Sequence, residues 1–308
     1  MKSFCISLEK YKDKWPELKT YFSQNGLPDI NIFSGVNGNE IGNFFVTKNA
    51  LDISEKTKSL IRSHGGVEKI VSTWGLFHLY NKLNRRDHAQ LSSWGAIGCA
   101  MSHLSIWKKI VDENMDMALI FEDDVSFKSG FKEKLQTVLK NIPQDADAVM
   151  LDVFVNFQPL QYDDTYTQIL GQFWGLHGYI MTQKGAKKLL EYAFPIEIQL
   201  DSYMGFSASL NRVKLYVVKD SLCSQKSHAS SIQTDFCVIC DVDDKKITDF
   251  QALIKNLYTH LSSSSSFYLF FSFCFLLTLF LVLLHPHLDI NFNILKHAHS
   301  SRWKYRLW

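Results

Sequence analysis

The stretch Ala118-Leu119-Ile120-Phe121-Glu122-Asp123-Asp124 joins a short apolar run to three consecutive carboxylates. The run predicts a buried strand, and ligands gather at the carboxyl ends of strands in open α/β sheets. Adjacent carboxylates repel one another unless a cation relieves them, and Mn²⁺ or Mg²⁺ takes oxygen ligands of this kind. Such an ion also accepts diphosphate oxygens and acts as a Lewis acid. The alternative interpretation is a solvated acidic turn that ends the strand.

On both sides of this stretch, apolar runs of strand length alternate with helical patterns. The sequence therefore predicts an α/β fold, a sheet flanked by helices. Residues 36–93 are less regular, and no elements are assigned there. The predicted strands are 4–8, 30–33, 117–121, 146–151, 179–182 and 213–218, and the predicted helices are 15–25, 98–112 and 185–193.

Composition and charge exclude several classes of protein. The 308 residues are 46% hydrophobic and 21% charged, which is typical of a globular chain. The net charge is +2 and the first 250 residues contain no dense basic run, so nucleic acid is not expected as a partner. The apolar run at residues 4–8 is too short for a secretory signal, so the catalytic part is expected to be cytoplasmic.

The carboxyl-terminal part has a different composition. Five serines at 262–266 precede the uncharged apolar run 267–284. A run of this length comes close to crossing a hydrocarbon core of about 30 Å. The predicted organisation is a catalytic domain at 1–258, a linker at 259–266, a transmembrane helix at 267–284 and a basic tail at 285–308, with association to a membrane. A buried helix and an amphiphilic extension are alternatives, and the orientation stays open.

Two blocks of motifs resemble glycosyltransferase family 25. The first is Gly95-Ala96-Ile97-Gly98-Cys99-Ala100-Met101-Ser102-His103, followed after a helix by Glu122-Asp123-Asp124. The second is Gly178 to Thr182, followed by Gly185-Ala186-Lys187-Lys188-Leu189 and then Asp201. The family includes lipooligosaccharide galactosyltransferases and procollagen galactosyltransferases. The resemblance implies a GT-A type fold that transfers a hexose, galactose or glucose, from a UDP-sugar with inversion to a hydroxyl of a glycan or protein.

The resemblance also implies a donor site. It assigns Mn²⁺ or Mg²⁺ to Asp124, together with Asp123 or Glu122, which are the acids that abut the apolar strand. His228, late in the predicted domain, is a further candidate for the metal or the diphosphate. Lys10 stands where the family usually has arginines, and it is a candidate for a donor phosphate without the bidentate fork of arginine.

Ser102 and His103 follow a run of small residues near a helix start. Glycines allow close approach of the backbone, and helix amides favour phosphate, so both residues are candidates for donor binding. A histidine in such a helix is equally often part of the packing.

Inversion requires a carboxylate that deprotonates the acceptor hydroxyl. Asp201 is the candidate for this role, and a helix N-cap is the alternative interpretation, because Asp suits that position. Asp152, directly after the predicted strand at 146–151, is a lesser candidate. Asp124 contributes to catalysis through the metal.

Two other functions compete with the transferase. A catalytically silent, membrane-tethered carbohydrate-binding or interaction module would keep the fold, but the intact acidic triplet argues against it. A metal-dependent phosphoesterase would also place acids after a strand, but it generally uses more His and Asp ligands, from several strands, for two metals.

Overall fold

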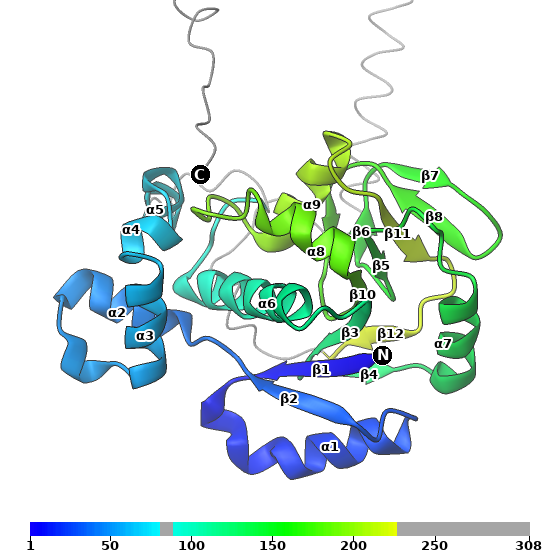
Figure 1. Ribbon diagram of the computed structural model, residues 1–308, viewed down its shortest axis with the longest axis horizontal. Helices are drawn as coiled ribbons and strands as arrows, with labels where there is room; N and C mark the ends of the chain where they lie inside the picture. Colours follow the sequence, from blue (N-terminus) through cyan, green and yellow to red (C-terminus); the bar gives the residue numbers. More distant parts are fainter. Residues whose placement is uncertain (81–88, 227–308) are drawn as a thin grey trace, which may run out of the picture. The chain divides into compact units, whose positions relative to one another are not determined.

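The computed structural model describes residues 1–80 and 89–226. A mixed eight-stranded sheet in the order β2-β1-β3-β10-β5-β11-β8-β7 lies at the centre of this part (Figure 1), and two two-stranded ribbons, β12-β4 and β6-β9, accompany it. The strands are β1 (Lys2–Ser7), β2 (Ile30–Ser34), β3 (Met117–Glu122), β4 (Val125–Phe127), β5 (Ala148–Met150), β6 (Val155–Asn156), β7 (Pro159–Gln161), β8 (Tyr166–Ile169), β9 (Phe173–Trp174), β10 (Gly178–Thr182), β11 (Leu215–Val218) and β12 (Cys223–Gln225).

Helices cover both faces of the sheet. The α-helices are α1 (Trp15–Gln24), α2 (Gly38–Thr47), α3 (Glu55–Ser63), α4 (Val67–Ile70), α5 (Thr73–Tyr80), α6 (Trp94–Asp112), α7 (Phe131–Lys140), α8 (Gln183–Leu190) and α9 (Leu200–Ser209). Two short 3₁₀ helices, η1 (Glu9–Lys14) and η2 (Ala50–Asp52), complete the set in the described ranges.

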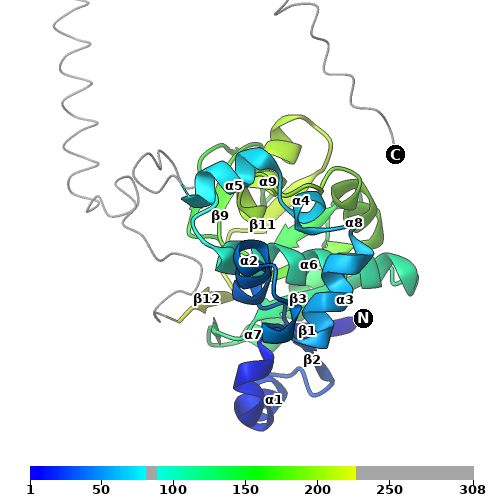
Figure 2. The same ribbon diagram turned by 90° about the vertical axis from the view of Figure 1, so that its left-hand side faces the viewer.

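The side chains of β3 alternate between two hydrophobic clusters. Ala118 and Ile120 pack in the cluster that contains the apolar residues of α6 and α8, whereas Leu119 and Phe121 pack in the cluster that contains those of α1 and α7. Because successive side chains of a strand point to opposite faces, the two clusters lie on opposite faces of the sheet. In Figure 1, α6 and α8 lie together against the sheet, and α2 to α5 gather beside them, which Figure 2 shows from the side.

The direction of β10 determines which residues share an edge of the sheet. β1 and β3 are parallel, and β10 lies antiparallel between β3 and β5, with Gly178 opposite Phe121 and Tyr179 opposite Met150. The carboxyl ends of β1, β3 and β5 therefore meet the start of β10 at one edge.

A close contact between glycines brings α2 against α6. A Cβ atom on Gly98 would lie 2.5 Å from the backbone nitrogen of Gly38 and 2.5 Å from the carbonyl oxygen of Val36. A Cβ atom on Gly38 would lie 1.7 Å from the carbonyl oxygen of Trp94. Gly98 of the 95–103 motif is thus required for helix packing beside the edge of the sheet.

The predicted α/β fold of a sheet flanked by helices is confirmed. The predicted strands 4–8, 30–33, 117–121, 146–151, 179–182 and 213–218 correspond to β1, β2, β3, β5, β10 and β11, and the predicted helices 15–25, 98–112 and 185–193 correspond to α1, α6 and α8. Helix α6 begins four residues before the prediction, at Trp94, because the Ser93 side chain accepts a hydrogen bond from the Ala96 amide and caps the helix.

Other elements were not predicted. Residues 36–93 contain α2 to α5, and the residues after β3 contribute α7, α9 and the short strands β4, β6 to β9 and β12. The predicted transmembrane helix at 267–284 and its flanking segments, 259–266 and 285–308, lie outside the described residues. Within residues 1–80 and 89–226, we find no helix with the length and hydrophobicity needed to cross a bilayer.

Substitution of Gly98 tests the close contact. We expect Gly98→Ala to lower the free energy of unfolding by roughly 1–3 kcal/mol, because the added methyl group meets backbone atoms that cannot rotate away. Urea denaturation monitored by circular dichroism measures the change. Ser105→Ala on the same helix is the control and should change the stability by less than about 0.5 kcal/mol. Equal stabilities of the two variants would contradict the packing described for Gly98.

Candidate active site

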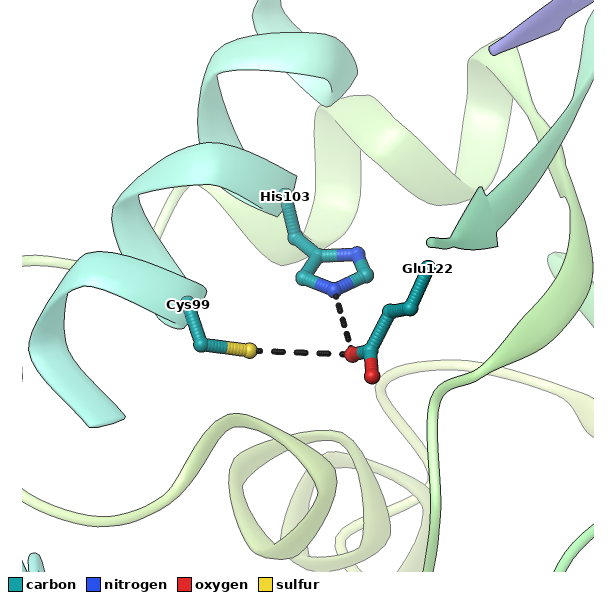
Figure 3. A group of neighbouring side chains, drawn as sticks. All are labelled: Cys99, His103 and Glu122. Atoms are coloured by element: carbon teal, nitrogen blue, oxygen red, sulfur yellow. Dashed lines mark hydrogen bonds and ion pairs between the residues drawn. The ribbon is translucent and has the colours of Figure 1, made fainter. Parts of the chain in front are cut away.

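Helix α6 and strand β3 bring together Cys99, His103 and Glu122 (Figure 3). Cys99 and His103 lie four residues apart and therefore share one face of α6. The His103 Nε2 atom is 3.1 Å from Glu122 Oε1, and the Cys99 thiol donates to the same oxygen over 3.8 Å. Glu122 ends β3, where its side chain is 17% exposed.

A buried chain of hydrogen bonds holds His103. Its Nδ1 atom lies 2.8 Å from the Tyr179 hydroxyl, which accepts a hydrogen bond from Trp107 Nε1, also at 2.8 Å. All three side chains are fully buried. The Tyr179 oxygen accepts a hydrogen bond from Trp107, so the hydroxyl can donate its own proton to Nδ1 of His103. The imidazole then carries its proton on Nε2 and donates it to Glu122. This assignment of protons follows from the hydrogen-bond network.

Glu122 is held in its ionised form. Burial raises the pKa of Glu122, but the hydrogen bond from His103 and the electrostatic attraction of the His103 and His177 rings outweigh burial and bring this pKa below its ordinary value. The edge of the sheet thus carries a negative charge at neutral pH next to Asp123 and Asp124.

Asp124 is the least satisfied carboxylate of the triplet. Its Oδ2 atom accepts a hydrogen bond from Gln225 at 2.6 Å, but Oδ1 is buried and has no hydrogen-bond partner among the described residues. Burial, followed by the charge of Glu122, raises the pKa of Asp124 to about 6. Burial also raises the pKa of Asp123, although the Ser7 hydroxyl donates a hydrogen bond to this carboxylate. The burial of the Asp123 and Asp124 carboxylates and the missing partner of Asp124 Oδ1 within the described ranges both favour a cation beside these oxygens.

The triplet opens into a cleft of about 910 Å³. The carboxylates of Glu122, Asp123 and Asp124 line it together with the amines of Lys10, Lys14 and Lys226. Aromatic side chains between them, Tyr11, Trp15 and Tyr21, also line the cleft. One cleft therefore offers acids, cations and aromatic rings.

Sequence reasoning missed one histidine at this edge. His177, which directly precedes β10, donates from Nε2 to Asp152 Oδ2 over 3.0 Å, and Ser221 donates to the other oxygen of Asp152. The side chain of His177 is 1% exposed, and its Nδ1 atom has no hydrogen-bond partner in the described part of the chain. The signal was a histidine immediately before a buried strand. Asp152, a lesser candidate for the base, is thus engaged with His177.

The other predicted residues are placed differently. The Ser102 hydroxyl lines the cleft but donates to the Gly98 carbonyl at 2.7 Å and accepts from the Val36 amide at 2.8 Å. Asp201 is 9% exposed in the first turn of α9, where its carboxylate accepts from the amides of Ser202 at 2.7 Å and Gly175 at 3.3 Å. The N-cap of α9 is Gln199. Donor binding by Ser102 and the basic role of Asp201 stay predictions, and His228 lies outside the described residues.

Comparison with known proteins identifies the class and then the family. The family model described as glycosyltransferase family 25 (LPS biosynthesis protein) matches residues 1–204. Because the match covers more than half of the 308 residues, the chain is a glycosyltransferase by class and belongs to glycosyltransferase family 25.

Curated relatives agree with this family. The chain is 33% identical over 115 residues to procollagen galactosyltransferase 1-A of Xenopus laevis, a match that covers 33% of the chain and 18% of the relative. It is 32% identical over 108 residues to procollagen galactosyltransferase 2 of Homo sapiens, a match that covers 31% of the chain and 16% of the relative. A glycosyltransferase 25 family member of Aedes aegypti is 32% identical to the chain over 127 residues, a match that covers 38% of the chain and 20% of the relative. The chain thus matches a fifth or less of the length of these relatives.

Removal of the Tyr179 hydroxyl tests the buried chain of hydrogen bonds. We expect Tyr179→Phe to lower the free energy of unfolding by about 1–3 kcal/mol, because Trp107 Nε1 and His103 Nδ1 lose their common partner. Transferase activity should also fall about 10-fold, because His103 no longer orients Glu122.

Tyr216→Phe is the matched control. The buried Tyr216 hydroxyl donates to Asp145 at 2.8 Å, outside the cleft lining. Its loss should cost stability without a loss of activity. If both variants lose activity equally, or if Tyr179→Phe loses only stability, then Tyr179 does not position Glu122.

Proposed function

We propose that this protein transfers a hexose, galactose or glucose, from a UDP-sugar to a hydroxyl group of a glycan or protein, with a divalent cation and inversion on a GT-A type fold. The observation that carries the proposal is the buried, unpartnered Oδ1 atom of Asp124 in a cleft that is also lined by lysines. Such an oxygen suits a cation, and the lysines suit the phosphates of a nucleotide.

The carboxylates fit a hard ion such as Mn²⁺ or Mg²⁺. Asp123 and Asp124 offer the oxygen ligands that these ions prefer, and burial, together with the charge of Glu122, raises the pKa of both groups, so a cation would stabilise their ionised forms. When bound, the ion would supply Lewis-acid stabilisation of the departing diphosphate. Glu122, held in its ionised form by His103, adds negative charge that strengthens the attraction for a cation.

The remaining walls of the cleft suit a nucleoside diphosphate. Lys10, Lys14 and Lys226 provide ammonium groups for the phosphates. Lys226 also anchors the site, because its backbone amide donates to the Asp124 carbonyl over 2.8 Å. Tyr11 and Trp15 offer rings against which a base can stack, and the volume of about 910 Å³ lies in the range of small-molecule sites.

Asp201 is our candidate for the base that takes the proton of the acceptor hydroxyl. Burial raises the pKa of Asp201 to about 6, a value suited to proton transfer near neutral pH. The charge of Glu122 contributes to this shift, so Asp201 lies within electrostatic reach of the cleft wall. The names of the relatives favour galactose as the transferred sugar.

Substitution of Asp124 tests the metal-dependent transfer. We expect Asp124→Asn to reduce release of UDP from a UDP-sugar by at least about 100-fold in the presence of Mn²⁺, because the charge that holds the ion is removed. The full chain is assayed with UDP-galactose and UDP-glucose, with Mn²⁺ and with EDTA.

Asp220→Asn is the matched control. Its side chain is 91% exposed, and the same change of charge there should leave the rate unaltered. UDP release that persists in EDTA would contradict the need for a metal. If a UDP-sugar binds to the folded wild-type protein in calorimetry but is never turned over with any acceptor, the silent binding module is the better description.

The pH profile tests Asp201. At saturating Mn²⁺, we expect the transfer rate to rise with pH through an inflection near 6, because Asp201 is protonated below this pKa and accepts a proton above it. Asp124 also has a pKa of about 6, but bound Mn²⁺ lowers it, so its contribution shifts to lower pH as the metal concentration increases. An inflection near 6 that disappears at saturating Mn²⁺ belongs to Asp124 and would remove Asp201 as the base.

A further inference from the structure

The Cys99, His103 and Glu122 side chains offer a ligand set of their own, because the proposed transfer uses Glu122 only for its negative charge, uses His103 only to hold Glu122, and does not use Cys99. Each contributes one donor atom, and the three atoms all lie within 4.8 Å of one another. Figure 3 shows the thiol and the imidazole, on successive turns of α6, both directed at the same carboxylate oxygen. A thiol, an imidazole and a carboxylate together favour Zn²⁺ or Co²⁺, whereas Mn²⁺ and Mg²⁺ prefer oxygen ligands.

Two of the three distances between the ligand atoms are close to those of a tetrahedral site. Typical Zn–S, Zn–N and Zn–O bonds place neighbouring ligand atoms about 3.3–3.6 Å apart. The Cys99 Sγ and Glu122 Oε1 atoms are 3.8 Å apart, and His103 Nε2 and the same oxygen are 3.1 Å apart. The third pair, the Cys99 thiol and the His103 imidazole nitrogen, lies within 4.8 Å, so a side-chain shift of up to roughly 1 Å would bring it to the tetrahedral separation and admit the ion.

The chain of hydrogen bonds behind His103 is suited to metal binding. A histidine that ligates a metal usually donates its other ring N–H to a fixed neighbour. Here the neighbour is the Tyr179 hydroxyl, 2.8 Å from Nδ1, and Trp107 fixes this hydroxyl in turn. When Nε2 ligates, the ring proton moves to Nδ1 and is donated to the Tyr179 oxygen, and the hydroxyl proton of Tyr179 rotates away from the imidazole.

The site is accessible from the cleft, and each proton displaced by metal binding is accounted for. Cys99, His103 and Glu122 all line the cleft, so an ion can enter from the side at which a nucleotide would bind. Binding of Zn²⁺ converts the thiol to a thiolate and releases one proton to solvent, with no change of oxidation state. Glu122 is already ionised, and the imidazole only changes its tautomer.

We propose that Cys99, His103 and Glu122 form a second metal site in the cleft, which binds a thiophilic divalent ion such as Zn²⁺. Occupancy withdraws Glu122 from His103 and places a second cation beside Asp123 and Asp124. The ion therefore inhibits the transferase. The existence of the site does not depend on the proposed function, whereas the inhibition rests on the proposed function.

Titration of the full chain with Co²⁺ tests the site by absorption spectroscopy. A Co²⁺–thiolate bond gives a charge-transfer band in the near ultraviolet. We expect the band to saturate at one Co²⁺ per chain, to be abolished by Zn²⁺ and to be absent in Cys99→Ser. In His103→Gln we expect the affinity for Co²⁺ to fall at least about 10-fold. Far-ultraviolet circular dichroism verifies that both variants are folded.

A double variant separates this site from the pair of cysteines at 237 and 240. Cys237→Ser with Cys240→Ser removes the Cys-x-x-Cys pair of the sequence and should retain the band. A band that survives in Cys99→Ser, or no band in the wild-type chain, would overturn the proposal.

Inhibition is measured as the Zn²⁺ concentration that halves Mn²⁺-supported UDP release, relative to the uninhibited rate of each protein. We expect this concentration to rise at least about 10-fold in Cys99→Ser. Equal values in the two proteins would remove the inhibitory role. If neither protein turns over a UDP-sugar, the proposed function fails, whereas the Co²⁺ band still decides whether the metal site exists.

Discussion

The hydrogen bond from His103 to Glu122 is the interaction on which the site depends. It keeps a largely buried carboxylate ionised at the end of β3, where burial alone would favour the protonated form. The same bond fixes α6 against the sheet, because His103 is itself held by Tyr179 of β10. Helix, central strand and neighbouring strand are therefore aligned by one series of polar contacts inside an otherwise apolar layer.

This fixed charge affects the neighbouring acids. Burial raises the pKa of Asp123 and Asp124, and the negative charge of Glu122 raises it further, so these groups hold their protons more tightly until a cation arrives. The lysines that line the cleft supply the opposite sign for an anion. A cleft that is acidic in one part and basic in another suits a ligand that brings its own cation, and a nucleoside diphosphate with a divalent metal is such a ligand.

The buried strands and three helices could be predicted from the sequence, because residues 117–121 and 179–182 are continuous apolar runs of the kind found in strands buried on both faces. Residues 36–93 could not be assigned by hydrophobic periodicity. Their local signals were capping residues such as Ser54, whose hydroxyl accepts from the Thr57 amide and begins α3. The very short strands β6 and β9 form only through pairing with each other, so no local pattern marks them.

The acidic triplet was identifiable because it follows a strand directly, whereas its partners depended on topology. An apolar run has the same residue pattern in a parallel and in an antiparallel strand, so the sequence did not reveal the direction of β10. In a parallel orientation, the residue before β10 would lie at the opposite edge of the sheet. Because β10 is antiparallel, His177 reaches the end of β3, and its carbonyl accepts a hydrogen bond from the Glu122 amide at 3.1 Å. The reversal of one strand therefore adds a histidine to an edge that parallel strands alone would have lined with acids.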